Sequence, residues 1–397
     1  MFPKKWHSRE KKSQLIERFD WIFPKNSKKI ILVVKKNTEF SGNLRVCADL
    51  LLKKKQHTLY VYKDGSMPGS IKNALNAQGI IVLKPNSWRS FYHILTASVF
   101  ILSHVPRDAH LSKKNKRRKV LGLWHGVAFK NIESQMISVL ESKMQLIKNN
   151  AKLYDLMVAS SEADRDYIAK SFLVDENIID VIGLPRYELL KSSYPVDSFL
   201  QCQKNKLNDI TLNKKFILYA PTFREKNDSA FDQICDKEWI RLNQYLEEID
   251  VILGLRPHSY DNKKPPTITE KMSHIVWLSH EEFTESNLVL QFVDVLLVDF
   301  SSIWIDFLLL DRPILGFAKD FEHYCKEERG FAYDFEETFP DVFTHSFSEL
   351  MINLKQLLES KCQTKEYIHA KGKFHKHSLN TSFSDTLVSS LKKSKII

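Results

Sequence analysis

DVLLVDFSSIWIDFLLLDRPILGF, residues 294–317, is the stretch of this chain that decides its fold class. It opens with an apolar, β-branched run that is typical of a strand buried in a parallel sheet. Asp299, Ser301 and Ser302 follow at the carboxyl end of this run, and the apolar residues 303–310 predict a buried helix. Open α/β sheets bind ligands at this end of a strand, and the unpaired N–H groups of a helix start attract anions. The stretch therefore indicates a phosphate-binding turn, with ordinary capping of the helix by its serines as the alternative.

Alternating strands and helices extend over the rest of the chain. In its first half, apolar runs predict strands at 29–35, 57–62, 80–83, 97–103, 120–124 and 153–159, and helices at 43–55 and 70–78. A second series has strands at 216–219, 251–255 and 274–278 and helices at 239–248, 348–359 and 384–391. This βαβ rhythm predicts an α/β protein with two Rossmann-like halves that face a cleft. The polar stretch 191–214 indicates the junction between them.

The composition fits a soluble protein with two domains. The chain has 397 residues, of which 43% are hydrophobic and 27% are charged. We expect a basic amphipathic segment at 1–28, a first Rossmann-like domain at 29–195, and a second one with a C-terminal helix at 196–397. Five scattered cysteines outside CxxC spacing indicate neither disulfides nor zinc, so a reducing cytoplasm is expected. We expect neither a secretory signal nor a transmembrane helix, because no sufficiently long apolar run occurs.

The net charge of +11 indicates a polyanionic partner or surface, or simply solubility. Basic residues crowd 4–12, 28–36, 53–55, 113–119 and 371–395. In the first cluster they are mixed with bulky apolar residues such as Trp6, Trp21 and Phe23. That mixture suits an interfacial helix on anionic lipid, and a helix that packs on the protein body is the alternative. No nucleic-acid-binding motif is present, so we expect no nucleic-acid partner.

Polar side chains follow four of the predicted strands, at the point where each strand ends. Histidine can act as a general base near neutral pH, and hydroxyl and guanidinium groups suit phosphate. The alternatives are a structural histidine and, for Arg224, a surface salt bridge to Glu225 or another acid. Four such strand ends together favour a functional site. They carry His125 and Gly126; Thr222 and Arg224; Arg256 and His258; and Asp299, Ser301 and Ser302.

A spaced set of motifs resembles the CDP-glycerol glycerophosphotransferases, which make teichoic acids and related capsule polymers. The motifs are WHGVAFKNI (124–132), YAPTFRE (219–225), LRPHS (255–259), VDFSSIWIDFLLLDRPILGF (298–317) and RGFAYDFEETFP (329–340), with weaker matches at EFSGNLR (39–45) and GLPRYE (183–188). The resemblance covers about residues 30–345. It implies a GT-B architecture, with the acceptor in the first domain and the donor mainly in the second. It also implies peripheral attachment to the inner face of the cytoplasmic membrane.

The resemblance further implies a reaction in which a polyol phosphate passes from a CDP-polyol, typically CDP-glycerol, to an acceptor hydroxyl, and CMP leaves. The acceptor would be a lipid-linked or oligosaccharide molecule. By motif, His125 and His258 match the family's two essential histidines. We assign His125 as the base on the acceptor hydroxyl, and His258 with Arg256 as partner of the donor's phosphates. The other residues expected to act are Thr222, Arg224, Ser301 and Ser302 as a phosphate cradle, Asp299 as the group that orients its turn or a nearby histidine, and Gly126 and Lys130 on the acceptor side.

No carboxylate cluster indicates an obligatory metal, and no other cofactor is expected. Three questions stay open: the donor, the class of protein and the oligomeric state. Val127 stands where the family usually has a threonine, so CDP-ribitol is an alternative donor. Two rival classes are a GT-B glycosyltransferase with a nucleotide-sugar donor and a basic, non-catalytic protein that binds a polyanion. The oligomeric state does not follow from the sequence.

Overall fold

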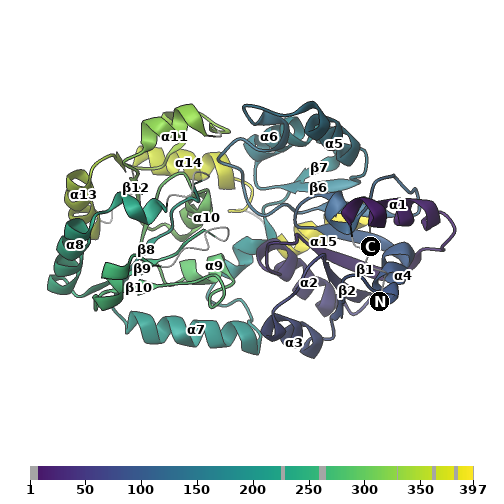
Figure 1. Ribbon diagram of the computed structural model, residues 1–397, viewed down its shortest axis with the longest axis horizontal. Coiled ribbons are helices and arrows are strands. Elements are labelled where there is room, and N and C mark those ends of the chain that lie inside the picture. Colours follow the sequence, from purple (N-terminus) through teal and green to yellow (C-terminus); the bar gives the residue numbers. More distant parts are fainter. Residues whose placement is uncertain are drawn as a thin grey trace. The chain divides into compact units, whose positions relative to one another are not determined.

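The computed structural model describes residues 8–224, 229–258, 265–328, 330–359, 364–379 and 383–396, which form two compact α/β units (Figure 1). The first unit comprises Met1–Val127, Glu133–Leu189 and His375–Ile397, and the second comprises Ala128–Ile132 and Leu190–Phe374. The limits of these units differ from the predicted 29–195 and 196–397.

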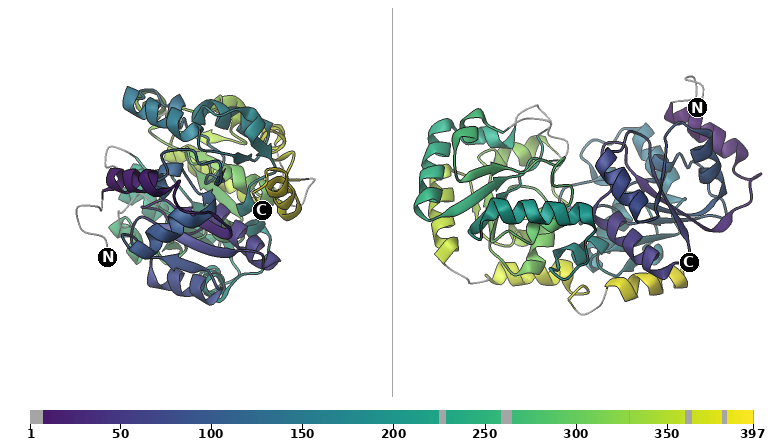
Figure 2. Two further views of the ribbon diagram at one scale, coloured as in Figure 1. Left: turned by 90° about the vertical axis from the view of Figure 1, so that its right-hand side faces the viewer. Right: turned by 90° about the horizontal axis from the view of Figure 1, so that it is seen from below.

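The last helix, α15 (Phe383–Lys393), belongs to the first unit rather than the second (Figure 2). Its apolar face is buried, and the hydroxyl of Ser390 donates a hydrogen bond to Asp180. Residues 128–132 belong to the second unit, because the amide of Ala332 donates to the Phe129 carbonyl at 3.0 Å. Neither assignment could be predicted from the sequence, because each segment contacts residues that are far away along the chain.

The first unit is built on a seven-stranded parallel sheet with the order β3-β2-β1-β4-β5-β6-β7. The continuous apolar runs that predict strands are buried on both faces, as parallel sheets require. Its strands are β1 (Asn26–Val34), β2 (Thr58–Lys63), β3 (Ile81–Leu83), β4 (Ala97–Leu102), β5 (Lys119–Gly122), β6 (Leu156–Ala159) and β7 (Ile179–Val181). Its other helices are α1 (Arg9–Phe19), α2 (Gly42–Lys54), α3 (Gly69–Ala77), α4 (Trp88–Thr96), α5 (Glu141–Ala151) and α6 (Glu162–Phe172).

The second unit is built on a six-stranded parallel sheet with the order β10-β9-β8-β11-β12-β13. Its strands are β8 (Lys215–Tyr219), β9 (Val251–Leu255), β10 (Ile275–Trp277), β11 (Val295–Val298), β12 (Ile314–Phe317) and β13 (Phe343–Thr344). Its helices are α7 (Ser198–Thr211), α8 (Asp236–Glu248), α9 (Ser286–Leu290), α10 (Ile303–Phe307), α11 (Phe321–Glu327), α12 (Phe335–Thr338), α13 (Phe347–Glu359) and α14 (Lys365–His375). The long helix predicted at 303–310 is shorter, because α10 passes into a 3₁₀ turn at Leu308.

Both sheets have a point at which the strand order reverses. In the first sheet it lies between β1 and β4, and in the second between β8 and β11. In open α/β sheets the carboxyl ends of the strands at such a point form the usual ligand site. The fold therefore directs attention to the residues that follow β4, β8 and β11.

Helix α1 packs on the first unit, as the alternative for the N-terminal segment expects. Ile16 is buried, Lys12 forms an ion pair with Asp64, and Arg118 bonds Asp20 at 2.6 Å. Trp6 lies outside the described residues. Within the part of the chain that is described, no helix is long and apolar enough to span a membrane.

Candidate functional site

The turn after β5 holds His125 on a constrained backbone. Trp124 has a φ of +52°, which bulky residues rarely adopt, and Gly126 has a φ of +143°. A Cβ atom at position 126 would lie 2.7 Å from Nη2 of Arg186, and L residues rarely adopt this φ, so the position favours glycine. On this turn the side chain of His125 is exposed to solvent.

Two residues that the sequence did not single out brace this turn. The side-chain amide of Asn43 donates to the carbonyls of Leu123 at 3.2 Å and Trp124 at 3.0 Å, and its oxygen accepts from the Arg186 amide at 3.0 Å. The guanidinium of Arg186 donates to the His125 carbonyl. Asn43 and Arg186 come from the two weaker motifs, EFSGNLR and GLPRYE. Those motifs therefore have a physical role, which is to fix the backbone that carries His125.

The ring of His125 stacks on His104, the second residue after β4. The ring centroids are 4.3 Å apart and the planes differ by 19°. Burial, and then the neighbouring charges of His125 and Lys35, lower the pKa of His104 well below its ordinary value. His104 is therefore a neutral platform under His125. The sequence showed it only as a histidine at the end of a predicted strand.

In the second unit, Asp299 ties together the ends of two neighbouring strands. Its Oδ1 accepts from the amides of Thr222 at 2.8 Å and Ser301 at 3.2 Å, and its Oδ2 accepts from Arg224 at 2.7 Å. The side chain is fully buried. Asp299 thus holds its own turn, one of the two roles expected of it, and the same bonds fix the loop after β8. Its part in the reaction stays a prediction.

The guanidinium of Arg224 lies between two carboxylates. Besides Asp299, it bonds Asp320 through Nε at 2.7 Å and Nη2 at 3.1 Å, and Nη1 donates to the Thr222 carbonyl at 2.9 Å. Burial lowers the pKa of Arg224, but the two carboxylates outweigh it and raise the pKa above its ordinary value. The predicted surface alternative is replaced by a buried ion pair, and Glu225 lies outside the described residues. Asp320 was missed because it follows β12 (Ile314–Phe317), a strand that the sequence did not predict.

Arg256 follows β9, and its guanidinium group is held through one nitrogen, Nη2. Its Nη2 donates to the Phe283 carbonyl at 2.8 Å and contacts Ser286 Oγ and His280 Nδ1, both at 3.2 Å. Its Nη1 is buried and has no hydrogen-bond partner among the described residues. Burial lowers the pKa of Arg256 to about 10, against the opposing effect of Glu285. A buried donor without a partner is costly, so this one suits an anion.

His258 and the two serines complete this set. His258 is half-buried, and its ring centroid lies 6.4 Å from that of Phe223. Ser301 and Ser302 are half-buried, and Ser302 makes no side-chain capping bond to α10. The alternative of ordinary capping is thus not realised by Ser302. Ser259, the last residue of its motif, lies outside the described residues.

The structure divides the predicted site residues between the units. His125 and Gly126 lie in the first unit, and all the others lie in the second. Lys130, expected on the acceptor side, is in the second unit, with its Nζ 3.4 Å from Thr222 Oγ1. In the described ranges, no group of three or more His, Cys, Asp or Glu side chains could hold a metal ion.

Two parallel, doubly wound sheets with polar strand ends define this chain as a protein of the GT-B fold class. It belongs to the CDP-Glycerol:Poly(glycerophosphate) glycerophosphotransferase family, whose model matches residues 15–385. Both the family and the enzyme class predicted from the motifs are therefore confirmed.

Three known proteins illustrate the relationship. The chain is 26% identical over 366 residues to the teichoic acid poly(glycerol phosphate) polymerase of Bacillus spizizenii (strain ATCC 23059 / NRRL B-14472 / W23), covering 89% of this chain and 88% of the relative. It is 25% identical to the teichoic acid poly(ribitol-phosphate) polymerase of the same strain, covering 88% of this chain and 54% of the relative. A solved structure of the wall teichoic acid polymerase TagF has a TM-score of 0.77 at 19% identity, covering 98% of this chain and 94% of that one, and thus shares the fold.

Proposed function

We propose that this enzyme transfers glycerol 3-phosphate from CDP-glycerol to a hydroxyl of a lipid-linked or oligosaccharide acceptor in teichoic-acid-like or capsule polymer synthesis. The observation that supports it most is the buried Nη1 of Arg256, which has no hydrogen-bond partner among the described residues. Arg256 directly follows β9, a strand next to the point of reversal in the second sheet. Transfer of ribitol phosphate from CDP-ribitol is the second candidate, because the ribitol relative matches at nearly the same identity.

In the proposed reaction the acceptor oxygen bonds to the phosphorus that carries the glycerol. The bond between this phosphorus and the bridging oxygen breaks, and CMP leaves with that oxygen and its electron pair. Negative charge grows on the bridging oxygen, so donors placed around it lower the barrier. Arg256, His258 and the hydroxyls of Ser301 and Ser302 are the groups we assign to this task, with Lys130 and Thr222 beside them.

His125 is the group we assign to receive the acceptor's proton. Its ring is exposed and oriented by the stack on His104, and Arg186 packs against Gly126 and fixes the backbone beside it. Arg224 is expected to act by fixing the turns after β8 and β11, because two carboxylates and a carbonyl occupy its N–H groups. Direct contact of Arg224 with phosphate stays a prediction.

The test is CMP release from CDP-glycerol and from CDP-ribitol in the presence of lipid and oligosaccharide acceptors. General-base and charge-stabilising groups contribute about 10²–10⁴-fold, so His125→Ala and His258→Ala should each reduce release by at least about 100-fold. His345→Ala, a histidine outside the set, serves as the matched control. Absence of CMP from both donors with folded wild-type protein would contradict the proposal. Release of a nucleoside diphosphate from a nucleotide sugar would support the glycosyltransferase rival.

We also infer that the first unit attaches to an anionic membrane surface, on the inner face of the cytoplasmic membrane. Four large apolar side chains are exposed where α1 ends and along α4: Trp21 (70%), Ile22 (54%), Trp88 (56%) and Tyr92 (50%). The Phe23 ring contacts Tyr92 with centroids 6.4 Å apart, which joins the two segments into one surface. Tryptophan and tyrosine are the residues that favour the membrane–water interface.

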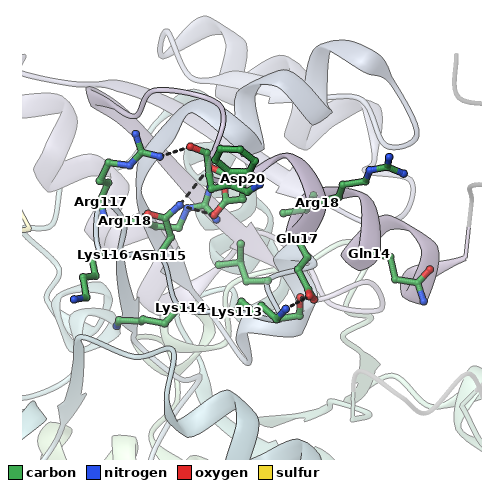
Figure 3. Close-up of a pocket in the computed structure, with 14 residues that line it drawn as sticks. Gln14, Glu17, Arg18, Asp20, Lys113, Lys114, Asn115, Lys116, Arg117 and Arg118 are labelled. Atoms are coloured by element: carbon green, nitrogen blue, oxygen red, sulfur yellow. Dashed lines mark hydrogen bonds and ion pairs between the residues drawn. The ribbon is translucent and has the colours of Figure 1, made fainter.

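A basic hollow of about 680 Å³ adjoins Trp21 (Figure 3). Its lining has six basic residues (Arg18, Lys113, Lys114, Lys116, Arg117 and Arg118) against the acidic Glu17 and Asp20. Asp20 is bonded by Arg118, and Glu17 forms an ion pair with Lys113. Lys114 is paired with Asp155, which lies outside the lining. The positive charge of the other basic residues, beside exposed aromatic rings, suits lipid phosphates.

Flotation on vesicles that contain phosphatidylglycerol tests this surface. Point variants are better than truncation, since α1 carries buried contacts of the first unit. Trp21→Ser with Trp88→Ser should abolish flotation, whereas the control pair Ile352→Ser and Ile368→Ser, equally exposed in the second unit, should not change it. Equal flotation of both double variants would contradict the inference.

A further inference from the structure

His280 bridges the side chain of Arg256 and the main chain of the same turn. Its Nδ1 lies 3.2 Å from Arg256 Nη2, and its Nε2 lies 2.9 Å from the Pro257 carbonyl oxygen. A guanidinium nitrogen only donates and a carbonyl oxygen only accepts. Nδ1 is therefore the acceptor and Nε2 carries the proton, so one neutral tautomer of His280 satisfies both bonds.

We propose that His280 is a positioning residue of the donor site, which fixes Arg256 and the adjoining His258 where they meet the donor's phosphates. This inference rests on the proposed function and deepens it. His280 connects the guanidinium directly to the backbone carbonyl that precedes His258. The imidazole thus fixes the position of the Arg256 guanidinium relative to His258.

The pattern of bonds around Arg256 supports this positioning role. We call the set of groups that holds its Nη2 atom the clamp. Three acceptors gather on Nη2, namely the Phe283 carbonyl, the Ser286 hydroxyl and His280, whereas Nη1 has none among the described residues. A guanidinium is planar and rigid, so holding one nitrogen fixes the direction of the other. The clamp leaves Nη1 preorganised for an anion, and preorganised donors stabilise charge without rearranging during the reaction.

The clamp works only while His280 is neutral. A protonated ring would point a second N–H group at the guanidinium and lose the bond from Arg256. Burial, followed by the charges of Arg256 and His258, lowers the pKa of His280 to about 2. The bridging tautomer therefore persists throughout the pH range in which an enzyme works.

Two substitutions separate positioning from mere filling of space. In His280→Gln, the amide can accept from Arg256 and donate to the Pro257 carbonyl, so both bonds have a replacement. In His280→Phe, the ring shape stays but both bonds are lost. His274→Phe is the matched control, because His274 is also half-buried and precedes β10, away from Arg256.

We expect His280→Phe to raise the KM for CDP-glycerol and lower kcat, each by about tenfold, since bonds that orient a charged group are lost. His280→Gln should restore most of both values, and His274→Phe should match wild type. If His280→Phe matches wild type, the proposal is wrong. It is also wrong if His280→Gln is as impaired as His280→Phe while both melt at the wild-type temperature.

A second measurement is independent of turnover. Long-range ¹H–¹⁵N correlation spectra of the unliganded full-length protein report the tautomer of each histidine. His280 should show a protonated Nε2 and an unprotonated Nδ1 from about pH 5 to about pH 8. A cationic or Nδ1-protonated ring would overturn the clamp. If wild type releases no CMP but shows the expected tautomer, the proposed function fails and the clamp of Arg256 stands.

Discussion

Replacement of Asp299 by asparagine measures how strongly the two strand ends of the second unit depend on one carboxylate. Asp299 is fully buried and accepts from the Thr222 amide, the Ser301 amide and Arg224 Nη1. Asparagine keeps one oxygen for the two amides. Its NH₂ group, however, would face the guanidinium of Arg224, donor against donor. The variant thus removes one ion pair at nearly constant volume.

The expected loss in the free energy of unfolding depends on the bonds that Arg224 retains. Removing one partner of a buried ion pair costs about 3–5 kcal/mol. Asp320 still bonds Arg224 at 2.7 Å and 3.1 Å, so we expect the lower limit, about 3 kcal/mol. For a unit of this size, each kcal/mol lowers the melting temperature by about 2–4 °C, which gives a decrease of about 6–12 °C.

Thermal unfolding followed by circular dichroism is the assay, with CMP release measured below the transition. Asp320→Asn is the control: its side chain is 27% exposed, so solvent screens the pair and the expected cost is about 1 kcal/mol or less. The KM for the donor should rise in Asp299→Asn, since its oxygens set the loops of Thr222 and Ser301. Equal destabilisation by the two variants, or a loss below about 0.5 kcal/mol in Asp299→Asn, would refute the reasoning.

Three further predictions address other parts of the site. Gly126→Ala should reduce CMP release by at least about tenfold and cost about 1–3 kcal/mol, because the backbone has a φ of +143° and the new Cβ meets Arg186; activity and denaturant unfolding test this. Ser301→Ala with Ser302→Ala should change stability by less than about 0.5 kcal/mol but raise the donor KM about tenfold, which initial rates would show. Burial raises the pKa of Asp164 to about 7, so the folded state binds this proton more tightly than the unfolded chain. The resulting stability is present below about pH 4 and is lost as the pH rises to about 7, by about 4 kcal/mol, and urea unfolding should show that Asp164→Asn lacks this loss.

Much of the fold could be predicted from sequence because buried parallel strands are continuous apolar runs. The strand predicted at 251–255 and the opening run of residues 294–317 match β9 and β11. Strands β7, β12 and β13, of two to four residues each, were not predicted. At β12, Gly316 has no side chain, and the ring of Phe343 takes the space that a Cβ would need. Such packing between distant segments leaves no local pattern.

The predicted site residues other than Lys130 follow strands, because an apolar run makes the end of a buried strand visible in a sequence. The residues that support them lie elsewhere. Asn43 and Arg186 hold the turn of His125 from 82 and 61 residues away, and Asp320 holds Arg224 from 96 residues away. No spacing rule connects such positions. The weak motif matches at 39–45 and 183–188 were the signal that could have identified the first two.

Each unit pairs a candidate catalytic histidine with a second histidine that stays neutral. His104 stacks on His125, and His280 bonds the carbonyl that precedes His258. In both partners burial is the largest cause of a lowered pKa, so neither ring carries a positive charge at physiological pH. A cationic partner would oppose the positive charge that His125 gains when it accepts a proton. A neutral ring orients it without that repulsion, which explains why an imidazole can serve as support beside a proton acceptor.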